Sequence, residues 1–131
     1  MKLKLEINNL VKSPVKKALI KNAVVKTLEK SGYDNLLKKN IFISLALVDE
    51  DEMKKINKEY RKKNRATDVL SFCECEDVEQ LKNNTDPALF LGELVLCYDY
   101  INRECANKKD LQRELVRVIA YGALHLLCFK H

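Results

Sequence analysis

Both histidines of the chain lie in one short segment, from Tyr121 to His131, whose side chains can bind a metal ion. Positions 121 and 125 are one helical turn apart, so Tyr121 and His125 would project side by side, in the spacing by which helices present two metal ligands. His131, arriving from the turn after the helix, would add a third ligand and leave an open zinc site of the catalytic type. The alternative is a packed His125 beside a terminal His131 that binds no metal.

A second candidate is the basic segment from Lys54 to Arg65, which carries seven cationic side chains in twelve residues. The planar guanidinium of an arginine such as Arg61 can hold a phosphate through two hydrogen bonds, whereas a lysine acts as a point charge. The segment therefore suits a polyanion. The same charges also suit the solvated end of a helix, where the helix dipole favours cations.

Glu93 and Cys128 are two further side chains that could line a site or bind a metal. Glu93 stands inside the apolar segment 91–96, where a carboxylate either faces solvent or lines a pocket, and Gly92 beside it permits the close approach of another chain. Cys128 lies three residues after His125, and its thiolate can replace a missing metal ligand. Five cysteines without a CxxC pair fit neither a disulfide framework nor a zinc ribbon, so we expect reduced thiols.

Hydrophobic periodicity predicts the elements that must position these side chains. Alternating or continuous apolar runs predict four strands, at residues 2–8, 41–48, 67–75 and 91–96. A spacing of three to four residues predicts four helices: one opening at Ser13-Pro14, two at about 50–61 and 98–108, and a last one capped by Asp110. Residues 76–90 are polar and are expected to form a loop that could swing over a site. Strands interleaved with helices predict an α+β, or mixed α/β, domain with a mixed sheet.

The length and composition limit the class of protein. With 131 residues, 47% of them hydrophobic and 33% charged, the chain has room for one domain with a packed core. No apolar stretch approaches the roughly 20 residues of a membrane-spanning helix, and no signal-peptide pattern is visible, so we expect a cytoplasmic protein without a membrane partner. The net charge of +5 is uneven, since residues 1–66 carry 17 basic and 8 acidic side chains. This asymmetry favours a face that meets a polyanion, although a basic half can also serve solubility.

Three segments together resemble the YbeY family of rRNA maturation factors, which are metal-dependent endoribonucleases. The stretch NKEYRKKNRATDVLSF at 57–72 is similar to that family's NxxYRxKDxPTDVLSF pattern, and LGEL at 91–94 resembles its LGDI strand. The sequence YGALHLLCFKH at 121–131 is in register with the family's HGxLHLxGYDH signature. The order and spacing of the three segments agree, and the order of strands and helices matches over nearly the whole chain.

The resemblance implies both a fold and a function. The fold would be a single domain with a four-stranded mixed sheet, four to five helices and a zincin-like metal helix. In this sequence we expect that domain to span residues 1–131 and to end at the last residue of the metal motif. The function would be single-strand-directed endoribonuclease activity in rRNA maturation and ribosome quality control. The implied partners are RNA, above all rRNA, and the ribosomal small subunit with its assembly factors. One zinc ion per chain would be the cofactor, with no small-molecule cofactor.

The resemblance also assigns roles by position. His125 and His131 match the second and third zinc-binding histidines of the family, and Arg61 matches its functional arginine. The zinc would act as a Lewis acid while Arg61 neutralises the charge of the pentacovalent phosphorus. Glu93, at an aspartate position, would be a cleft residue. Four basic side chains would bind the RNA: Arg61, Lys62, Lys63 and Arg65.

The sequence departs from the family pattern at the metal site. Tyr121 stands at the first histidine position, and a neutral phenol, with an ordinary pKa of about 10, is a poorer zinc ligand than imidazole. Lys130 replaces an aspartate and adds positive charge beside the third ligand. Weak or absent zinc binding is therefore the physical expectation, unless Cys128 or the terminal carboxylate supplies a ligand.

Two other functions can be weighed against the endoribonuclease. A catalytically impaired RNA- or ribosome-binding module of the same fold would keep the basic cleft without the metal, and it remains open as the alternative. A zinc peptidase is set aside, because Gly122 occupies the place of the glutamate in the HExxH motif.

Overall fold

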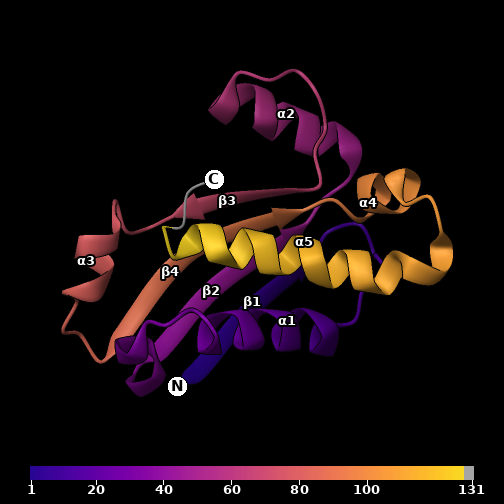
Figure 1. The fold of residues 1–131 in the computed structure, drawn as a ribbon. Helices are drawn as coiled ribbons and strands as arrows, with labels where there is room; N and C mark the ends of the chain where they lie inside the picture. Colours follow the sequence, from indigo (N-terminus) through magenta and orange to yellow (C-terminus); the bar gives the residue numbers. More distant parts are fainter. Residues whose placement is uncertain (129–131) are drawn as a thin grey trace.

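Four strands form one mixed sheet in the computed structural model, which describes residues 1–128 (Figure 1). They are β1 (Lys2–Asn9), β2 (Asn40–Leu47), β3 (Val69–Cys73) and β4 (Ala88–Leu96). Their spatial order is β1-β2-β4-β3, with β2 parallel to both β1 and β4, and β3 antiparallel to β4. This arrangement confirms the mixed α/β domain with a four-stranded mixed sheet.

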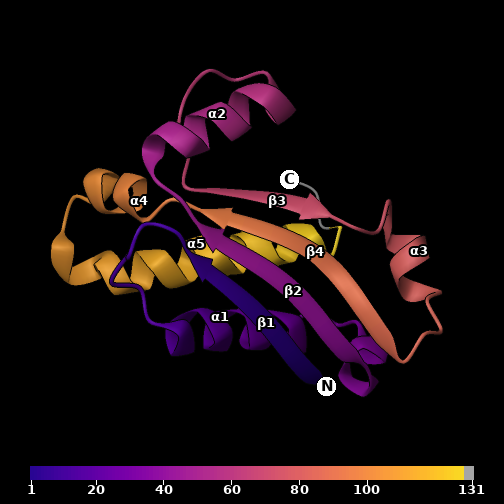
Figure 2. The same cartoon turned by 180° about the vertical axis from the view of Figure 1, so that it is seen from behind.

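Five α-helices surround the sheet within residues 1–128. They are α1 (Lys17–Glu29), α2 (Glu50–Arg61), α3 (Val78–Lys82), α4 (Tyr98–Glu104) and α5 (Leu111–Leu126), with short 3-10 turns at Asp34–Lys38 and Lys108–Asp110. Figures 1 and 2 show α1 and α5 side by side on one face of the sheet, whereas α2 stands over β3. In this part of the chain, every helix is too short or too polar to cross a bilayer.

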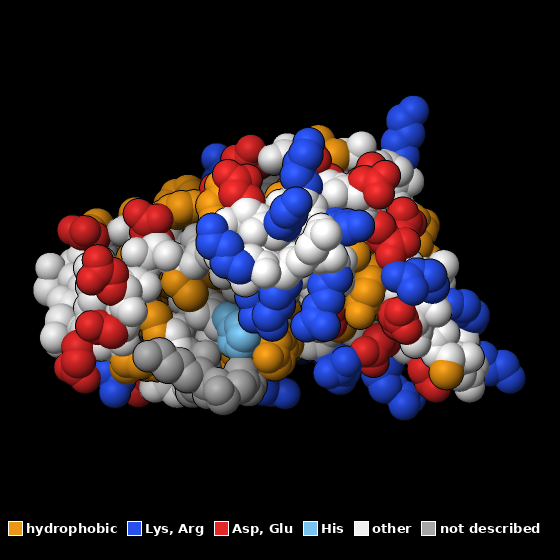
Figure 3. Space-filling view, turned by 90° about the horizontal axis from the view of Figure 1, so that it is seen from above, with side chains coloured by type: hydrophobic (Ala, Val, Ile, Leu, Met, Phe, Trp, Pro, Cys, Tyr) orange, Lys and Arg blue, Asp and Glu red, His pale blue; other side chains and the backbone are white. Residues whose placement is uncertain are grey.

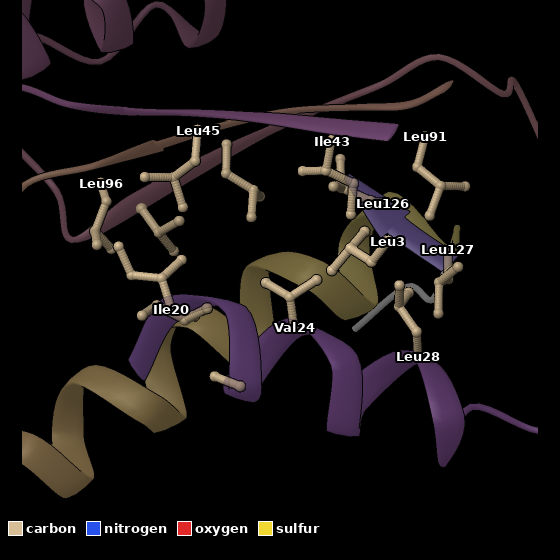
Figure 4. Close-up of a cluster of buried hydrophobic side chains, with 14 of the residues drawn as sticks. Leu3, Ile20, Val24, Leu28, Ile43, Leu45, Leu91, Leu96, Leu126 and Leu127 are labelled. Carbon is tan, nitrogen blue, oxygen red and sulfur yellow. The ribbon is translucent and has the colours of Figure 1, made fainter. Parts of the chain in front are cut away.

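The main core lies between the sheet and the layer formed by α1 and α5. Figure 4 shows Ile20, Val24 and Leu28 of α1 pointing toward the sheet, from which Ile43 and Leu45 of β2 point back. All five side chains are at most 2% exposed. Burying an aliphatic side chain of this size stabilises a fold by about 1.5–3 kcal/mol, so these contacts hold α1 against the sheet. Helix α5 adds Leu115, Val118 and Ile119 to the same core.

Helix α2 packs on a second, smaller cluster, on the opposite face of the sheet. Its Met53 is fully buried and belongs to the same cluster as Leu70 of β3. The helix begins where the sequence predicts, because the Asp49 carboxylate accepts a hydrogen bond of 2.8 Å from the Glu52 N–H. It ends at Arg61, since Lys62 adopts a left-handed conformation with φ of 60°. The basic turn that follows α2, residues 62–65, therefore begins above β3 (Figure 1).

Four local predictions are wrong, one of them the helix expected at 98–108, because α4 ends at Glu104. Helix α1 begins at Lys17 and not at Ser13, because the Asn9 side chain holds the Ser13 N–H and carbonyl through hydrogen bonds of 2.8 and 2.9 Å. The polar segment 76–90 is not one loop: it contains α3, anchored by the fully buried Leu81, and β4 begins at residue 88. Asp110 precedes α5, but within the described chain its side chain makes no capping hydrogen bond.

Candidate functional site

A cleft of about 730 Å³ opens between the end of α2, strand β3 and helix α5. Three stretches that are far apart in sequence line it: Tyr60 and Arg61; residues 67–72; and Arg117, Val118, Tyr121 and His125. In Figure 3 a histidine side chain is visible in a hollow, and Lys and Arg side chains crowd over it. The structure thus places Arg61, Tyr121 and His125 along the same cleft.

The α2 wall of the cleft is fixed by a buried asparagine. Asn57 is 1% exposed, and its side-chain amide donates a hydrogen bond of 2.8 Å to the Arg65 carbonyl. The Asn57 carbonyl accepts a further bond of 3.3 Å from the Lys63 N–H, so both ends of the turn after α2 are attached to the helix. Arg61 lines the cleft, whereas Lys62, Lys63 and Arg65 are exposed but are not among the lining residues.

The α5 wall presents an aromatic ring and an imidazole in contact. The ring centroids of Tyr121 and His125 are 4.5 Å apart, with an angle of 47° between the ring planes. Tyr121 is 41% exposed, and His125 is half-buried. The helical spacing that sequence analysis assigned to these two residues is therefore present.

Strand β3 holds this wall in place. The Ser71 hydroxyl donates to the Gly122 carbonyl at 3.0 Å, and the Cys73 thiol donates to the His125 carbonyl at 2.8 Å. A Cβ atom at Gly122 would lie 3.1 Å from both Leu94 and Val69, so the helix can approach the sheet this closely because residue 122 is glycine. Burial raises the pKa of the Cys73 thiol, which favours the protonated form that donates this bond.

Two charged residues of the cleft were missed by the sequence analysis. Arg117 lies on α5 one turn before Tyr121, and its Nε donates to the Glu114 carboxylate at 3.2 Å. This ion pair lowers the pKa of Glu114 and raises the pKa of Arg117, so both groups stay ionised near neutral pH. Asp68 lies beside β3, and its Oδ1 accepts a hydrogen bond of 2.7 Å from the Val69 N–H. The i, i+4 spacing of Arg117 and Tyr121 was the signal that could have revealed the arginine.

Glu93 is placed differently from the expectation. It is exposed, lies opposite Phe72 in the β3–β4 register, and is not among the residues that line the cleft. Ser71 on β3 faces α5, whereas Phe72 and its neighbour Glu93 face the other side of the sheet. The proposed cleft role of Glu93 is therefore corrected to that of a solvent-facing carboxylate. The accompanying expectation for Gly92 is confirmed, because a Cβ atom there would lie 2.1 Å from the Phe72 carbonyl oxygen.

The described residues do not by themselves make a metal centre. Within residues 1–128, no group of three His, Cys, Asp or Glu side chains is arranged to hold a metal ion. His125 and the phenol of Tyr121 share the cleft, while the Cys128 thiol donates to the Cys75 carbonyl at 3.7 Å. The third expected ligand, His131, lies outside the described residues. One imidazole and one phenol fit a zinc ion poorly, because zinc sites are built from Cys, His, Asp and Glu ligands.

The groups that are present suit a nucleic acid strand. Two guanidinium groups can bind phosphate oxygens, and the exposed rings of Tyr60 and Tyr121 can stack on bases. The rim continues into the exposed basic turn after α2.

Comparison with known proteins decides the family. Residues 6–131 match the family model described as Endoribonuclease YbeY. A protein named Endoribonuclease YbeY from Acinetobacter baumannii is 34% identical over 100% of this chain and 82% of its own length. The protein of that name from Zymomonas mobilis is also 34% identical, over 87% of this chain and 68% of its own length. The chain belongs to the YbeY family.

The structural comparison agrees with this assignment. A solution structure of a Thermotoga maritima protein superposes with a TM-score of 0.54 and 26% sequence identity, covering 98% of this chain and 75% of the other. YbeY proteins are metal-dependent endoribonucleases, that is, hydrolases that act on RNA. The YbeY resemblance stated from the three sequence segments is therefore confirmed.

Proposed function

We propose that this YbeY-family chain is a single-strand-directed endoribonuclease of rRNA maturation, and that its RNA substrate binds in the cleft between α2 and α5. The observation that carries the proposal is the meeting of Arg61 and His125 on opposite walls of one cleft. RNA would enter over the basic turn after α2, where Lys62, Lys63 and Arg65 are exposed. The uneven charge of the chain supports the same direction of approach.

Arg61 is the residue to which we assign the main catalytic role. Its guanidinium would hold the scissile phosphate and stabilise the additional negative charge that develops at the pentacovalent phosphorus. The exposed rings of Tyr60 and Tyr121 would hold the unpaired bases on either side. Double-stranded RNA keeps its bases stacked in the helix and cannot use such rings, which favours single-stranded substrates.

Zinc is the cofactor that the family resemblance suggests, at one ion per chain. When bound, it would supply a Lewis acid for the phosphodiester. Because the described donors fit zinc poorly, we assign no step of the reaction to it. We further propose the ribosomal small subunit and its assembly factors as partners, ribosome quality control as a role and the cytoplasm as the compartment.

The first test is cleavage of an unstructured, labelled RNA by the wild-type chain and by Arg61→Ala. Removing one charge-stabilising group of this kind lowers rates by about 10²–10³-fold, and we expect a loss of that size for Arg61→Ala. Lys54→Ala removes a cation from α2 outside the cleft lining and should cleave like the wild type. Equal cleavage by Arg61→Ala and the wild type would contradict the assigned role.

A non-catalytic RNA-binding module is the second candidate function, and the Tyr121 phenol in the cleft favours it. Such a module would bind RNA with an affinity that falls with salt and with Arg61→Ala but does not change on addition of a chelator. RNA that stays intact at every zinc concentration, while still binding, would favour this module over the nuclease.

A further inference from the structure

Arg117 brings a second guanidinium to the cleft, from the wall opposite Arg61. Arg61 is the last residue of α2, whereas Arg117 lies in the middle of α5, one turn before Tyr121. The two helices stand on opposite sides of β3 (Figure 1). A strand of RNA lying in the cleft would therefore have a cationic side chain on each side of it.

The guanidinium of Arg117 is held in position by Glu114, but this contact uses only some of its N–H donors. Its Nε and Nη2 donate to the two oxygens of the Glu114 carboxylate, and its side chain is 65% exposed. Arginine carries five N–H donors, so three remain for a ligand in the cleft. Asp68 also attracts Arg117 electrostatically, and the Asp68 Oδ1 is engaged by the Val69 N–H. These contacts orient the guanidinium in advance, which lowers the entropic cost of binding an anion.

We propose that Arg117 forms a second phosphate-binding subsite of the cleft, which takes a phosphodiester group of the RNA strand on the α5 side of the group held by Arg61. The subsite rests on the proposed function, because it requires RNA to lie in this cleft. It contributes to the affinity and positioning of the strand. The described donors on the α5 wall fit a zinc ion poorly. The guanidinium of Arg117 is a source of positive charge on that wall.

The simpler explanation is a surface ion pair on α5 with no ligand, and the chain provides a matched control for it. Arg113 lies one turn earlier on the same helix, is 86% exposed and approaches the Asp110 carboxylate at 3.9 Å. Arg113 is not among the residues that line the cleft. Both arginines carry the same charge on the same helix. Removing either one should therefore weaken the nonspecific attraction of RNA to the protein by the same amount.

The test measures the affinity of a fluorescently labelled, unstructured RNA by anisotropy over a range of KCl concentrations. We expect Arg117→Ala to weaken binding about tenfold at low salt, and to reduce the slope of log K against log salt by about 0.7, the loss of one phosphate contact to a single strand. Arg113→Ala should leave the slope unchanged. Arg117→Lys keeps the charge and should retain most of the slope, which would tie the loss in Arg117→Ala to the missing positive charge.

The Glu114→Gln variant separates a ligand-binding role from a structural one. If Arg117 binds phosphate, removing the competing carboxylate leaves RNA affinity equal or higher. If Arg117 acts only by fixing α5, Glu114→Gln should weaken binding as much as Arg117→Ala, and this result would overturn the subsite. Wild-type affinity in Arg117→Ala together with weaker binding in Arg61→Ala would overturn the subsite alone. A wild-type chain without salt-dependent RNA affinity would overturn the proposed function as well.

Discussion

Tyr121 is the residue that decides how this cleft can treat a metal ion. Its ring contacts the His125 imidazole and is 41% exposed, so the position faces the cleft. A phenol is an uncommon ligand of zinc, whereas imidazole is one of its standard ligands. One substitution at this position therefore changes a poor donor into a good one, without moving the helix that carries it.

We predict that Tyr121→His raises the zinc content of the purified protein to nearly one ion per chain, while the wild type holds clearly less. The reason is that two imidazoles one helical turn apart form the ligand pair of helical zinc sites. Elemental analysis after purification without chelators measures the content. Tyr121→Phe is the control, because it keeps the ring but offers no imidazole. Nearly one zinc ion per chain in the wild type would show that another group replaces the missing ligand.

At the level of elements, the cleft depends on the close pairing of β3 with β4. Gly92 has a φ of 140°, in a region that side chains rarely adopt, and the Phe72 carbonyl lies where its Cβ would be. The same short strand β3 bonds to α5 through Ser71 and Cys73. Any displacement of β3 from β4 would therefore also displace the wall that carries Tyr121 and His125.

We predict that Gly92→Ala lowers the free energy of unfolding by at least about 3 kcal/mol, because a backbone atom at 2.1 Å cannot move aside without breaking the ladder. Urea denaturation followed by circular dichroism measures the change. Gly32→Ala is matched in having a positive φ, of 86°, but its Cβ would meet no described atom within 4 Å. It should cost about 1–2 kcal/mol. Similar losses in the two variants would argue against a steric role for the Phe72 carbonyl.

For the whole molecule, the thiols should make stability depend on alkaline pH. Burial raises the pKa of Cys75 and Cys97 above their ordinary value of 9.0. The folded chain thus keeps these protons at a pH where the unfolded chain releases them. The resulting stabilisation is complete below about pH 9 and is lost as pH rises toward the folded-state pKa. We predict that the urea concentration at the midpoint of unfolding falls between pH 8 and pH 10. The fall should be smaller in Cys97→Ala, which has lost one of the buried thiols. Identical pH profiles for this variant and the wild type would contradict the prediction.

The sequence predicts the elements of this fold well where one periodicity dominates. Helix α2 spans the predicted residues because Asp49 and the acids after it act locally, whatever packs above them. Predictions fail where distant residues decide the conformation. Asn9 holds Ser13 outside helix α1, and Leu81 is drawn into the core to form α3. Neither contact can be predicted from the local pattern of hydrophobic residues.

The candidate site is predictable to a similar degree. Spacing alone brings Tyr121 and His125 to one helical face, and the family motif brings Arg61 to the cleft. Strand alternation cannot say which face of a sheet meets a helix, so the orientation of Glu93 stayed open until the β3–β4 register was known. Arg117 escaped notice because an arginine three residues after Glu114 is typical of any exposed helix.

The two walls of the cleft are made at different times during translation. Helix α2 ends at residue 61 and strand β3 at residue 73, whereas α5 begins at residue 111. Strand β4, which lies between β2 and β3 in the sheet, is made in the interval. A nascent chain stalled before residue 111 would display the basic turn without the opposite wall. Such a chain would contact the RNA of its own ribosome only through the positive charges of the basic turn, because α5 would be missing. The cleft that we propose to bind RNA is therefore complete only after most of the polypeptide has been synthesised.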